Sequence, residues 1–553
     1  MSWNRFAVCF LLIAAFVSPS LAQESVDIVI RGGKIVDGTG NPWFIGDVAI
    51  KGDRIVGVGR VGDVDAKLTI DASGLVVSPG FIDMHSHSDF LLLEDGNAQS
   101  KIRQGVTTEV LGEGRSAGPY QGKLSPRTAR VGTGSRRWTR LKDYLALVEE
   151  KGISTNVASY VGLDTIWQCA MGTSFQRPSE DDFKLMEKLV DEAMRDGAHG
   201  LSSQVMMPPG SLTSTDDVIR LCRVVGKHGG IYSTHIRNEG LGVFSAVKEA
   251  IEIGEKAGVP VDVIHLKIAD EKYWGRMPEV IELIEGARAR GVNVQANVYP
   301  YTRGNNNLSS IIPPWAHEGG KKKMLERLKD KETRQRLKRD ITSGIEGWYN
   351  HYTAVGGDWS RMLVSGNNSL KGLTMDRVMS IRTKNNPEAD LLDELFEILI
   401  ENNGSVGTVY AHHTEKDMNL ALKQPWCSVG SDGSAYAISG SLRRGNPHPR
   451  NFGTFPRVLG VYVRELKLLT LEDAIRKITS LNAAKIGLRK RGQLQSGFYA
   501  DVTIFDEATV IDKSAYTEPF QYPVGIKHVL VNGVHVLNNE KHTNARPGRA
   551  LRQ

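Results

Sequence analysis

The sequence predicts an α/β fold: a (β/α)8 TIM-like barrel that carries a small β-sandwich domain built from both ends of the chain and an inserted subdomain. Three observations predict it. Strand-like and amphipathic helical segments alternate through the middle of the chain, short strands and turns fill both ends, and polar residues gather where the middle strands end. Alternating strands and helices are typical of parallel sheets and barrels, which keep their chemistry at the C-terminal ends of their strands.

The two ends of the chain are expected to form one composite β-domain, from residues 23–78 and 488–553. The first of these stretches has short apolar runs separated by turns such as Arg31-Gly32-Gly33. The second repeats that pattern, and its Asn532-Gly533 pair is typical of a tight hairpin turn. The catalytic barrel, residues 79–487, would then be inserted between the two halves of this domain.

The barrel strands can be assigned from the sequence in order. One strand ends near His85, and the others are expected at residues 106–112, 154–161, 200–206, 230–236, 261–268, 292–299 and 428–432. Helical patterns at 182–195, 243–257 and 278–290 separate some of them. The stretch of about 302–408 does not fit this repeat, so we interpret it as an inserted subdomain that covers the site. Its basic run, 321–339, favours a solvated helix face.

The first 22 residues predict a signal peptide. Arg5 precedes an apolar run, 6–17, which is followed by small residues up to Ala22. We therefore expect an exported protein, periplasmic or secreted after cleavage near Ala22. The run is short for a bilayer span, and no later stretch approaches the roughly 20 apolar residues of a spanning helix, so no stable membrane anchor is expected. The remaining cysteines are too scattered for a disulfide framework: Cys169, Cys222 and Cys427.

Composition narrows the class of partner. The chain has 553 residues, with 69 basic against 63 acidic residues, and this small excess is no reason to propose nucleic acid. No Gly-x-x-x-x-Gly-Lys-Ser/Thr pattern occurs, so a bound nucleotide is not predicted either. A small-molecule substrate is the remaining expectation, and the oligomeric state is left open.

Histidines at predicted strand ends indicate a metal site. His85 and His87 point to the same side of an extended segment, because side chains alternate in strands. His235 and His265 end two further strands, and Asp432 ends the eighth. Each histidine alone is also compatible with a role in the core. Together they form a set of zinc-type ligands at one mouth of the barrel.

These motifs resemble the amidohydrolase superfamily in order and spacing. The resemblance rests on Gly80-Phe81-Ile82-Asp83-Met84-His85-Ser86-His87, His235, His265, Gly430-Ser431-Asp432 and the segment 492–501. Residues 233–240, 298–302 and 313–315 resemble the N-acyl-D-amino-acid deacylase (D-aminoacylase) branch. The resemblance implies metal-dependent hydrolysis of the amide bond of an N-acyl-D-amino acid, which releases a carboxylate and a free D-amino acid.

The resemblance also implies roles for the ligands. That branch typically has a metal-binding cysteine after the second strand, where this chain has Glu113. We expect Glu113, His235 and His265 to hold the tighter metal position, and His85 with His87 a second one. Zinc is the expected ion, as one or two divalent ions, although a carboxylate is harder than a thiolate and leaves metal count and identity open. Asp432 is expected to take a proton from water and return it to the leaving nitrogen.

The carboxylate of an N-acyl amino acid requires a cation in the site. Arg237 lies on the same strand face as His235 and suits bidentate binding. Lys267 and Arg303 are further candidates, since Lys267 could instead neutralise acids of the metal site and Arg303 could be a solvated loop residue. Tyr299 is expected to orient the substrate carbonyl, or else to pack.

Three alternatives stay open at this point. A cyclic-amide hydrolase of the dihydroorotase or hydantoinase kind commonly uses a carboxylated lysine on the fourth strand, and the segment 200–205 has none. A dipeptidase acting on C-terminal D-residues would need the same ligands. A non-catalytic binding relative should have lost some of the metal ligands, which are all present.

Overall fold

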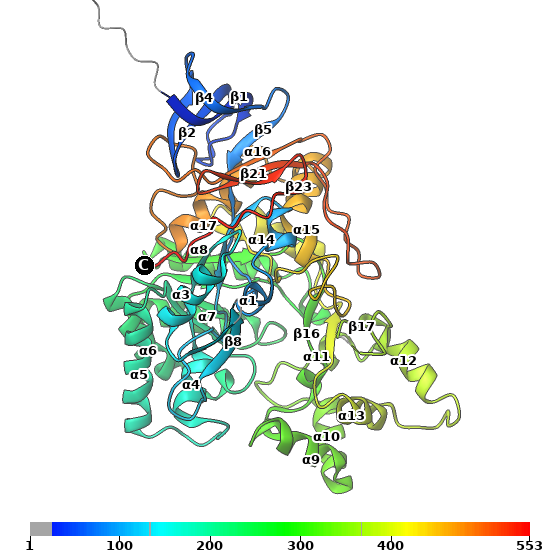
Figure 1. Cartoon of the computed structure of the whole chain (residues 1–553). Helices are drawn as coiled ribbons and strands as arrows, with labels where there is room; N and C mark the ends of the chain where they lie inside the picture. The colour runs from blue at the N-terminus through cyan, green and yellow to red at the C-terminus, as the bar shows by residue number, and fades with distance from the viewer. Residues whose placement is uncertain (1–24, 132–133, 367) are drawn as a thin grey trace, which may run out of the picture.

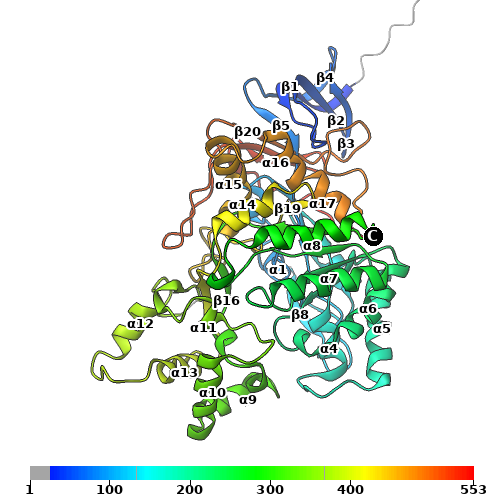
Figure 2. The same ribbon diagram turned by 180° about the vertical axis from the view of Figure 1, so that it is seen from behind.

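The computed structural model describes residues 25–131, 134–366 and 368–553. The predicted signal peptide, residues 1–22, lies outside this range. Figures 1 and 2 show a β-layer at one end of the molecule, the barrel below it and a helical lobe to one side of the barrel. No helix within the described ranges has the length and apolar character that a membrane span requires.

The β-layer is one sheet made from both ends of the chain. In the described part of the protein it has nine strands, ordered β23-β22-β21-β20-β5-β1-β2-β3, with β4 paired to β1. The two ends meet where β5 pairs antiparallel with β20, Pro79 opposite Val502. Asn532 and Gly533 both have positive φ and turn the chain between β21 and β22, as expected for a tight hairpin. The predicted domain boundaries stay a prediction. The strands are β1 (Ser25–Ile35), β2 (Phe44–Lys51), β3 (Arg54–Gly59), β4 (Asp65–Asp71), β5 (Val76–Pro79), β20 (Val502–Phe505), β21 (Ile526–Val531), β22 (Val534–Asn538) and β23 (Lys541–His542).

The predicted barrel is confirmed. Its strands pair in parallel, in chain order, as an arc from β6 to β10 and an arc from β11 to β19. The arcs meet where β10 continues into β11, and a parallel bridge from Ser86 to Gly433 links the first strand to the last. The strands are β6 (Phe81–Asp83), β7 (Val106–Leu111), β10 (Asn156–Ser159), β11 (Val161–Gly162), β12 (Gly200–Gln204), β13 (Ile231–His235), β14 (Val261–Val263), β15 (Val294–Val298) and β19 (Cys427–Val429).

Amphipathic helices cover the outside of the barrel (Figure 2). They begin after N-caps such as Ser179 and Ser214, whose side chains accept from the backbone amides three residues on. Their apolar faces join the strands in one large core, which holds the strand ends, and therefore the site, in place. These helices include α5 (Glu180–Arg195), α6 (Thr215–Lys227), α7 (Val243–Ala257), α8 (Met277–Ala289) and α14 (Glu415–Lys423).

The segment between β15 and β19 contains a lobe with its own apolar core (Figure 1). Its strands β16 (Gly304–Asn307) and β17 (Met362–Val364) pair antiparallel with β18 (Gly407–Tyr410). The basic run forms α9 (Lys321–Lys329) and α10 (Lys331–Ser343). On α10, Lys338 lies 2.5 Å from Asp393 of α13 (Leu391–Glu401), so part of this charge pairs within the lobe.

Candidate metal centre

A buried ion pair holds the ends of the first and last barrel strands together. Asp83 ends β6, and its carboxylate lies 2.6 Å from the Lys101 ammonium. The same carboxylate accepts hydrogen bonds from the Ser431 amide at 2.8 Å and hydroxyl at 2.5 Å. Gly430 allows this close approach, because a Cβ there would lie 2.8 Å from the Cβ of His85. His85 and Asp432 are thus positioned by one buried network.

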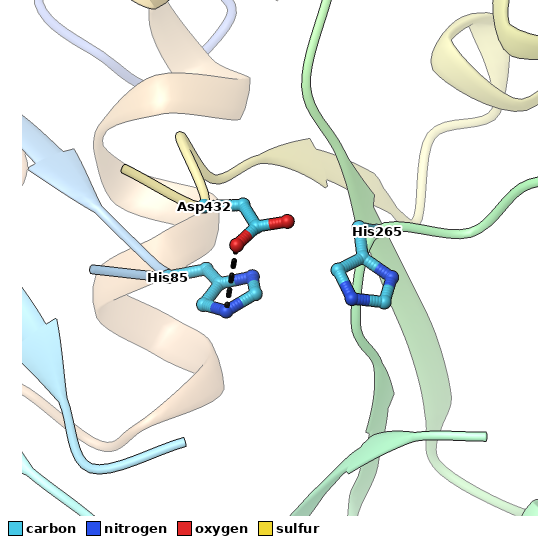
Figure 3. Close-up of side chains that lie close together, drawn as sticks. All are labelled: His85, His265 and Asp432. Carbon is cyan, nitrogen blue, oxygen red and sulfur yellow. Dashed lines mark ion pairs between the residues drawn. The ribbon is translucent and has the colours of Figure 1, made fainter. Parts of the chain in front are cut away.

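The six predicted metal-site and catalytic residues converge at the mouth of the barrel. His85 Nε2 lies 3.2 Å from His87 Nε2, and His265 Nε2 lies 3.1 Å from His235 Nδ1. Glu113 follows β7 and bridges the two pairs: its Oε2 lies 3.5 Å from His85 Nε2, and its Oε1 lies 3.6 Å from His235 Nδ1. Asp432 Oδ1 lies 3.0 Å from His87 Nε2. Figure 3 shows His85, His265 and Asp432 facing a common space.

This arrangement fits a metal ion. Donor atoms bound at about 2.0 Å at the corners of a tetrahedron lie roughly 3.3 Å apart, which is close to the separations above. Glu113 Oε1 is buried and has no hydrogen-bond partner among the described residues, an arrangement that a metal bond would relieve. Within the described part of the chain, three sets of donors have suitable geometry: Glu113 with His235 and His265, Glu113 with His85 and His87, and His85 with His265 and Asp432.

Glu239 lies behind two of the histidines and orients them. Its Oε1 lies 3.1 Å from His265 Nδ1 and 3.5 Å from His235 Nε2, on the ring nitrogens that do not face Glu113. Lys267 Nζ lies 2.5 Å from the same oxygen. Carboxylates that accept from the second nitrogen of a histidine ligand fix its tautomer and strengthen its basicity. Lys267, a predicted substrate residue, thus neutralises this carboxylate and is itself buried.

Two residues of the centre have strained backbones. His265 has φ of 40° and Asp432 has φ of 51°, in the left-handed region that non-glycine residues rarely adopt. Such conformations cost about 1–3 kcal/mol each and persist where the surrounding structure dictates them. The sequence offers no signal for this, because neither residue is a glycine or lies in a predicted turn.

The charges of the site keep Asp432 ionised. Burial alone would raise the pKa of this carboxyl, but the Arg450 guanidinium, the charge of His85 and the hydrogen bond to His87 hold it well below its usual value. Burial would likewise lower the pKa of His87, whereas the hydrogen bond to Asp432 and the charge of Glu113 raise it above the ordinary value. Asp432 is therefore available as a proton acceptor.

Two of the predicted substrate-binding residues, Arg237 and Arg303, do not line the cavity that lies over the metal centre. The Arg237 guanidinium does not line the cavity: it lies 2.7 Å from Glu249 and donates to the Ser211 and Thr213 carbonyl oxygens. Arg303 stacks over the ring of Tyr516 at 4.7 Å and also does not line the cavity. Neither cation is placed to hold a substrate carboxylate.

Tyr299, by contrast, lies beside the centre. Its ring is 6.2 Å from that of His265. Its hydroxyl is buried, and the structure shows no hydrogen-bond partner for it within the described ranges. Like Arg237 and Arg303, Tyr299 does not line the cavity over the centre.

Arg450 is the cation that the sequence analysis missed. It begins α15 (Arg450–Arg457), beyond the last barrel strand, is 4% exposed, and its Nη1 lies 2.7 Å from Asp432 Oδ2. Its guanidinium lies over the Tyr299 ring at 4.9 Å. Arg450 does not end a strand, and its signal in the sequence is the preceding Pro449, which favours the start of a helix after the eighth strand.

A cavity of about 590 Å³ opens over the centre. It is lined by His87, Glu113, His235, His265, Asp432 and Arg450, and also by residues of the lobe such as Asn305. Its volume falls in the range of small-molecule sites. The chain therefore presents a metal-binding donor set, a proton acceptor and a buried cation to one small cavity.

Known proteins share this organisation. The model of the amidohydrolase family matches residues 68–273 and 440–537. D-aminoacylase of Alcaligenes xylosoxydans xylosoxydans is 34% identical over 534 residues, which cover 96% of this chain and 98% of that protein.

Two solved structures are similar over the same extent. A crystal structure of N-acyl-D-glutamate deacylase from Bordetella bronchiseptica, with zinc and a phosphonate mimic of the tetrahedral intermediate, superposes with a TM-score of 0.78 at 30% identity, covering 96% of this chain and all of that one. The second is a structure of D-aminoacylase, an enzyme with a binuclear metal centre in which one metal activates and the second attenuates. It superposes with a TM-score of 0.78 at 32% identity and covers 96% of this chain and 100% of that chain. Since a full-length relative exceeds 30% identity and the family model matches more than half of the residues, the chain belongs to the amidohydrolase family.

Proposed function

We propose that this protein hydrolyses the amide bond of N-acyl-D-amino acids and releases a carboxylate and a free D-amino acid. The observation that carries the proposal is the placement of the metal donor set, Asp432 and Arg450 around one cavity. The relatives that act on N-acyl-D-amino acids, by their names, match over nearly their whole length, which supports the substrate class and the D-configuration.

Zinc is the proposed metal, as one ion or two. Glu113, His235 and His265 would hold the first ion, and His85 and His87 with the second oxygen of Glu113 would hold another. A bound zinc ion polarises a carbonyl oxygen and lowers the pKa of water towards about 7. Glu239, 3.1 Å from His265 Nδ1, is placed to orient His265, and Lys267 balances the charge of Glu239.

Asp432 would move the proton. Its Oδ1 faces His87 and lies near the donor set, while Arg450 holds Oδ2. In this position the carboxylate accepts a proton from the attacking water and returns it to the amide nitrogen as that nitrogen leaves. The pKa depression described above keeps the carboxylate unprotonated before the reaction.

Arg450 takes the role that we first expected for Arg237. It is the buried guanidinium that reaches the cavity, and a carboxylate can share its donors with Asp432. The Tyr299 ring lies under this guanidinium, and its hydroxyl, which has no hydrogen-bond partner among the described residues, would orient the same part of the substrate. The fourth strand, β12, contains no lysine that could be carboxylated as in cyclic-amide hydrolases, which favours an acyclic amide.

Export is also proposed. The order of basic, apolar and small residues in positions 1–22 supports a periplasmic or secreted enzyme, processed near Ala22. N-terminal sequencing of the protein recovered outside the cytoplasm should begin at or next to Gln23. A chain that retains Met1 and stays in the cytoplasm would contradict this.

The test of the activity measures release of free amino acid from paired N-acetyl-D- and N-acetyl-L-amino acids. Purified protein is assayed with added zinc and, in parallel, after chelation. We expect cleavage of the D-series alone, lost on chelation and restored by zinc. Cleavage of neither series, with a cyclic amide opened instead, would overturn the deacylase proposal.

A further inference from the structure

A second cavity continues from the first one, away from Arg450. Its volume is about 460 Å³, and Arg115, Gln204 and Asn306 line both cavities. It lies between the loops after the second, third and fourth barrel strands and the lobe, which contributes residues such as Ser309 and Met324. The metal centre and this second cavity thus form one elongated site.

The order of the strands in the barrel assigns the second cavity to the acyl group. Arg450 and Tyr299 belong to the eighth and seventh strands and the loops after them, whereas Asp164 and Gln204 follow the third and fourth, across the mouth. A substrate whose carboxylate lies at Arg450 and whose amide lies at the metal centre must direct its acyl chain towards Arg115 and Gln204. This step rests on the proposed function.

Asp164 is the buried acid in the wall of this cavity. It lies in the first turn of α4 (Leu163–Met171), is 2% exposed and lines the second cavity. Its Oδ1 makes no hydrogen bond to any described residue. The nearest paired cation is Arg115, whose Nε lies 3.9 Å from Oδ2 and whose side chain is 68% exposed. A buried carboxylate in this state is costly unless a ligand supplies its partner.

The walls of the cavity argue against a simple hydrocarbon chain as its ligand. Trp167, Phe175 and Met207 offer apolar contact, but polar side chains lie among them. A cavity for an alkyl chain would bury these groups without partners. Polar residues of the lining include Arg115, Asp164, Gln204, Asn306 and Asn307.

We propose that the second cavity is an acyl-group subsite that selects acyl chains bearing an ammonium group, which the Asp164 carboxylate binds. The substrates of choice would then be D-amino acids whose amide nitrogen carries an amino-substituted acyl group, larger than acetyl. Gln204 and Asn306, at the junction, would pair with the polar atoms of the chain between the amide and the ammonium.

Matched pairs of acyl groups test this, all attached to the same D-amino acid. Glycyl, β-alanyl and 4-aminobutyryl derivatives are compared with the propionyl, butyryl and pentanoyl derivatives of equal length, by kcat/KM with the zinc-loaded enzyme. At one chain length or more, we expect the ammonium-bearing member to be preferred by about 10- to 100-fold, as for a charge-assisted hydrogen bond. Equal values, or a preference for the alkyl member at every length, would overturn the inference.

The variant Asp164→Asn should reduce that preference to about twofold or less, and Asp270→Asn is the matched control. Asp270 is also a buried acid, but it caps the Lys272 amide and lines neither cavity. An unchanged preference in Asp164→Asn would contradict the role of Asp164. If Asp164→Asn does not fold, the comparison of matched acyl derivatives with the native enzyme still tests the inference. An N-acetyl-D-amino acid is included in the same assay as a reference substrate. If it is cleaved but no ammonium-bearing derivative is preferred, this inference alone is wrong. If no derivative is cleaved, the proposed function is wrong.

Discussion

Glu113 is the residue on which the metal centre depends most. Its two oxygens face different histidine pairs, and it belongs to two of the three donor sets. Burial would raise the pKa of its carboxyl, but the close approach of the His235 and His85 rings holds it well below the usual range. A charged bridging carboxylate is a harder ligand than a thiolate, so this position sets the chemistry of the metal as well as its affinity.

Replacing Glu113 with Gln should weaken metal binding by at least about 100-fold, since a neutral amide removes the only charge shared by the two donor sets. Metal content after dialysis, measured by mass spectrometry, is the readout. Glu279→Gln, an exposed salt-bridge residue on α8, serves as the control and should retain its metal. Full metal content in Glu113→Gln would show that the histidines suffice.

Arg450 and Arg237 have the same side chain, but only Arg450 is expected to bind the substrate carboxylate. Arg450→Lys should raise KM for an N-acetyl-D-amino acid by about 10- to 100-fold, because lysine cannot form the same bidentate contacts. Arg237→Lys should leave KM within about twofold, since Arg237 is paired with Glu249 outside the cavity. Steady-state kinetics of both variants provide the measurement. A larger increase in KM for Arg237→Lys than for Arg450→Lys would show that Arg237 is the residue that binds the substrate carboxylate.

At the scale of elements, the ends of the barrel strands position the residues of the metal centre, and the loops after them form the second cavity. β6, β13, β14 and β19 each end next to a residue of the centre. The loops after β7, β11 and β12 and the lobe at β16 build the second cavity instead. The strands are held by the core, so metal geometry is rigid, while the specificity that we propose lies in the connecting segments.

Pairing of β21 with β22 brings two histidines together far from the site. His528 Nδ1 lies 3.1 Å from His535 Nε2, and burial, followed by the charges of His535 and Lys527, lowers the pKa of His528 to about 4. A histidine with a lowered pKa is neutral in the fold and gains its proton more readily when unfolded. Its contribution to stability is therefore present above about pH 6.5 and is lost as the pH falls towards about 4.

His528→Gln should therefore flatten the loss of stability on acidification. Between pH 6.5 and 4 we expect the native protein to lose about 1–3 kcal/mol more unfolding free energy than the variant, as measured by denaturant titration at each pH. Parallel curves for the two proteins would show that His528 does not titrate in this range.

At the scale of the whole molecule, the C-terminal segment connects the β-layer to the underside of the barrel. Val157 donates to the Arg549 carbonyl at 2.9 Å and accepts from the Leu551 amide at 2.7 Å, so the last residues run beside β10. The Leu551 carbonyl lies 3.0 Å from His199 Nε2. These contacts lie at the opposite end of the strands from the metal centre.

Removal of residues 549–553 should lower the Tm by at least about 2 °C, because it leaves the buried backbone groups of Val157 and the Nε2 atom of His199 without partners. Differential scanning calorimetry measures this. Arg552→Ala removes only a partly exposed ion pair with Glu149 and should change the Tm little. An equal Tm for the truncated and full chains would show that the segment is not part of the folded core.

The sequence by itself was sufficient for the barrel, because apolar periodicity and turn residues are local signals. It predicted the strands that end at His85, His235 and His265, and the structure brings these residues together with Glu113 and Asp432. Strand alternation and strand order place such side chains at one mouth wherever the barrel forms. The hairpin at Asn532-Gly533 follows from the same local chemistry.

Only the tertiary structure decided which cations reach the cavity. Strand alternation placed Arg237 beside His235, but packing of α7 presents Glu249 to its guanidinium and withdraws it from the site. Arg450 enters from a helix beyond the last strand, and Oδ1 of Asp164 is left without a hydrogen bond among the described residues where the barrel loops meet the lobe. Long charged side chains pair with the nearest opposite charge in the folded protein. Which charge is nearest depends on tertiary packing and cannot be predicted from local sequence patterns.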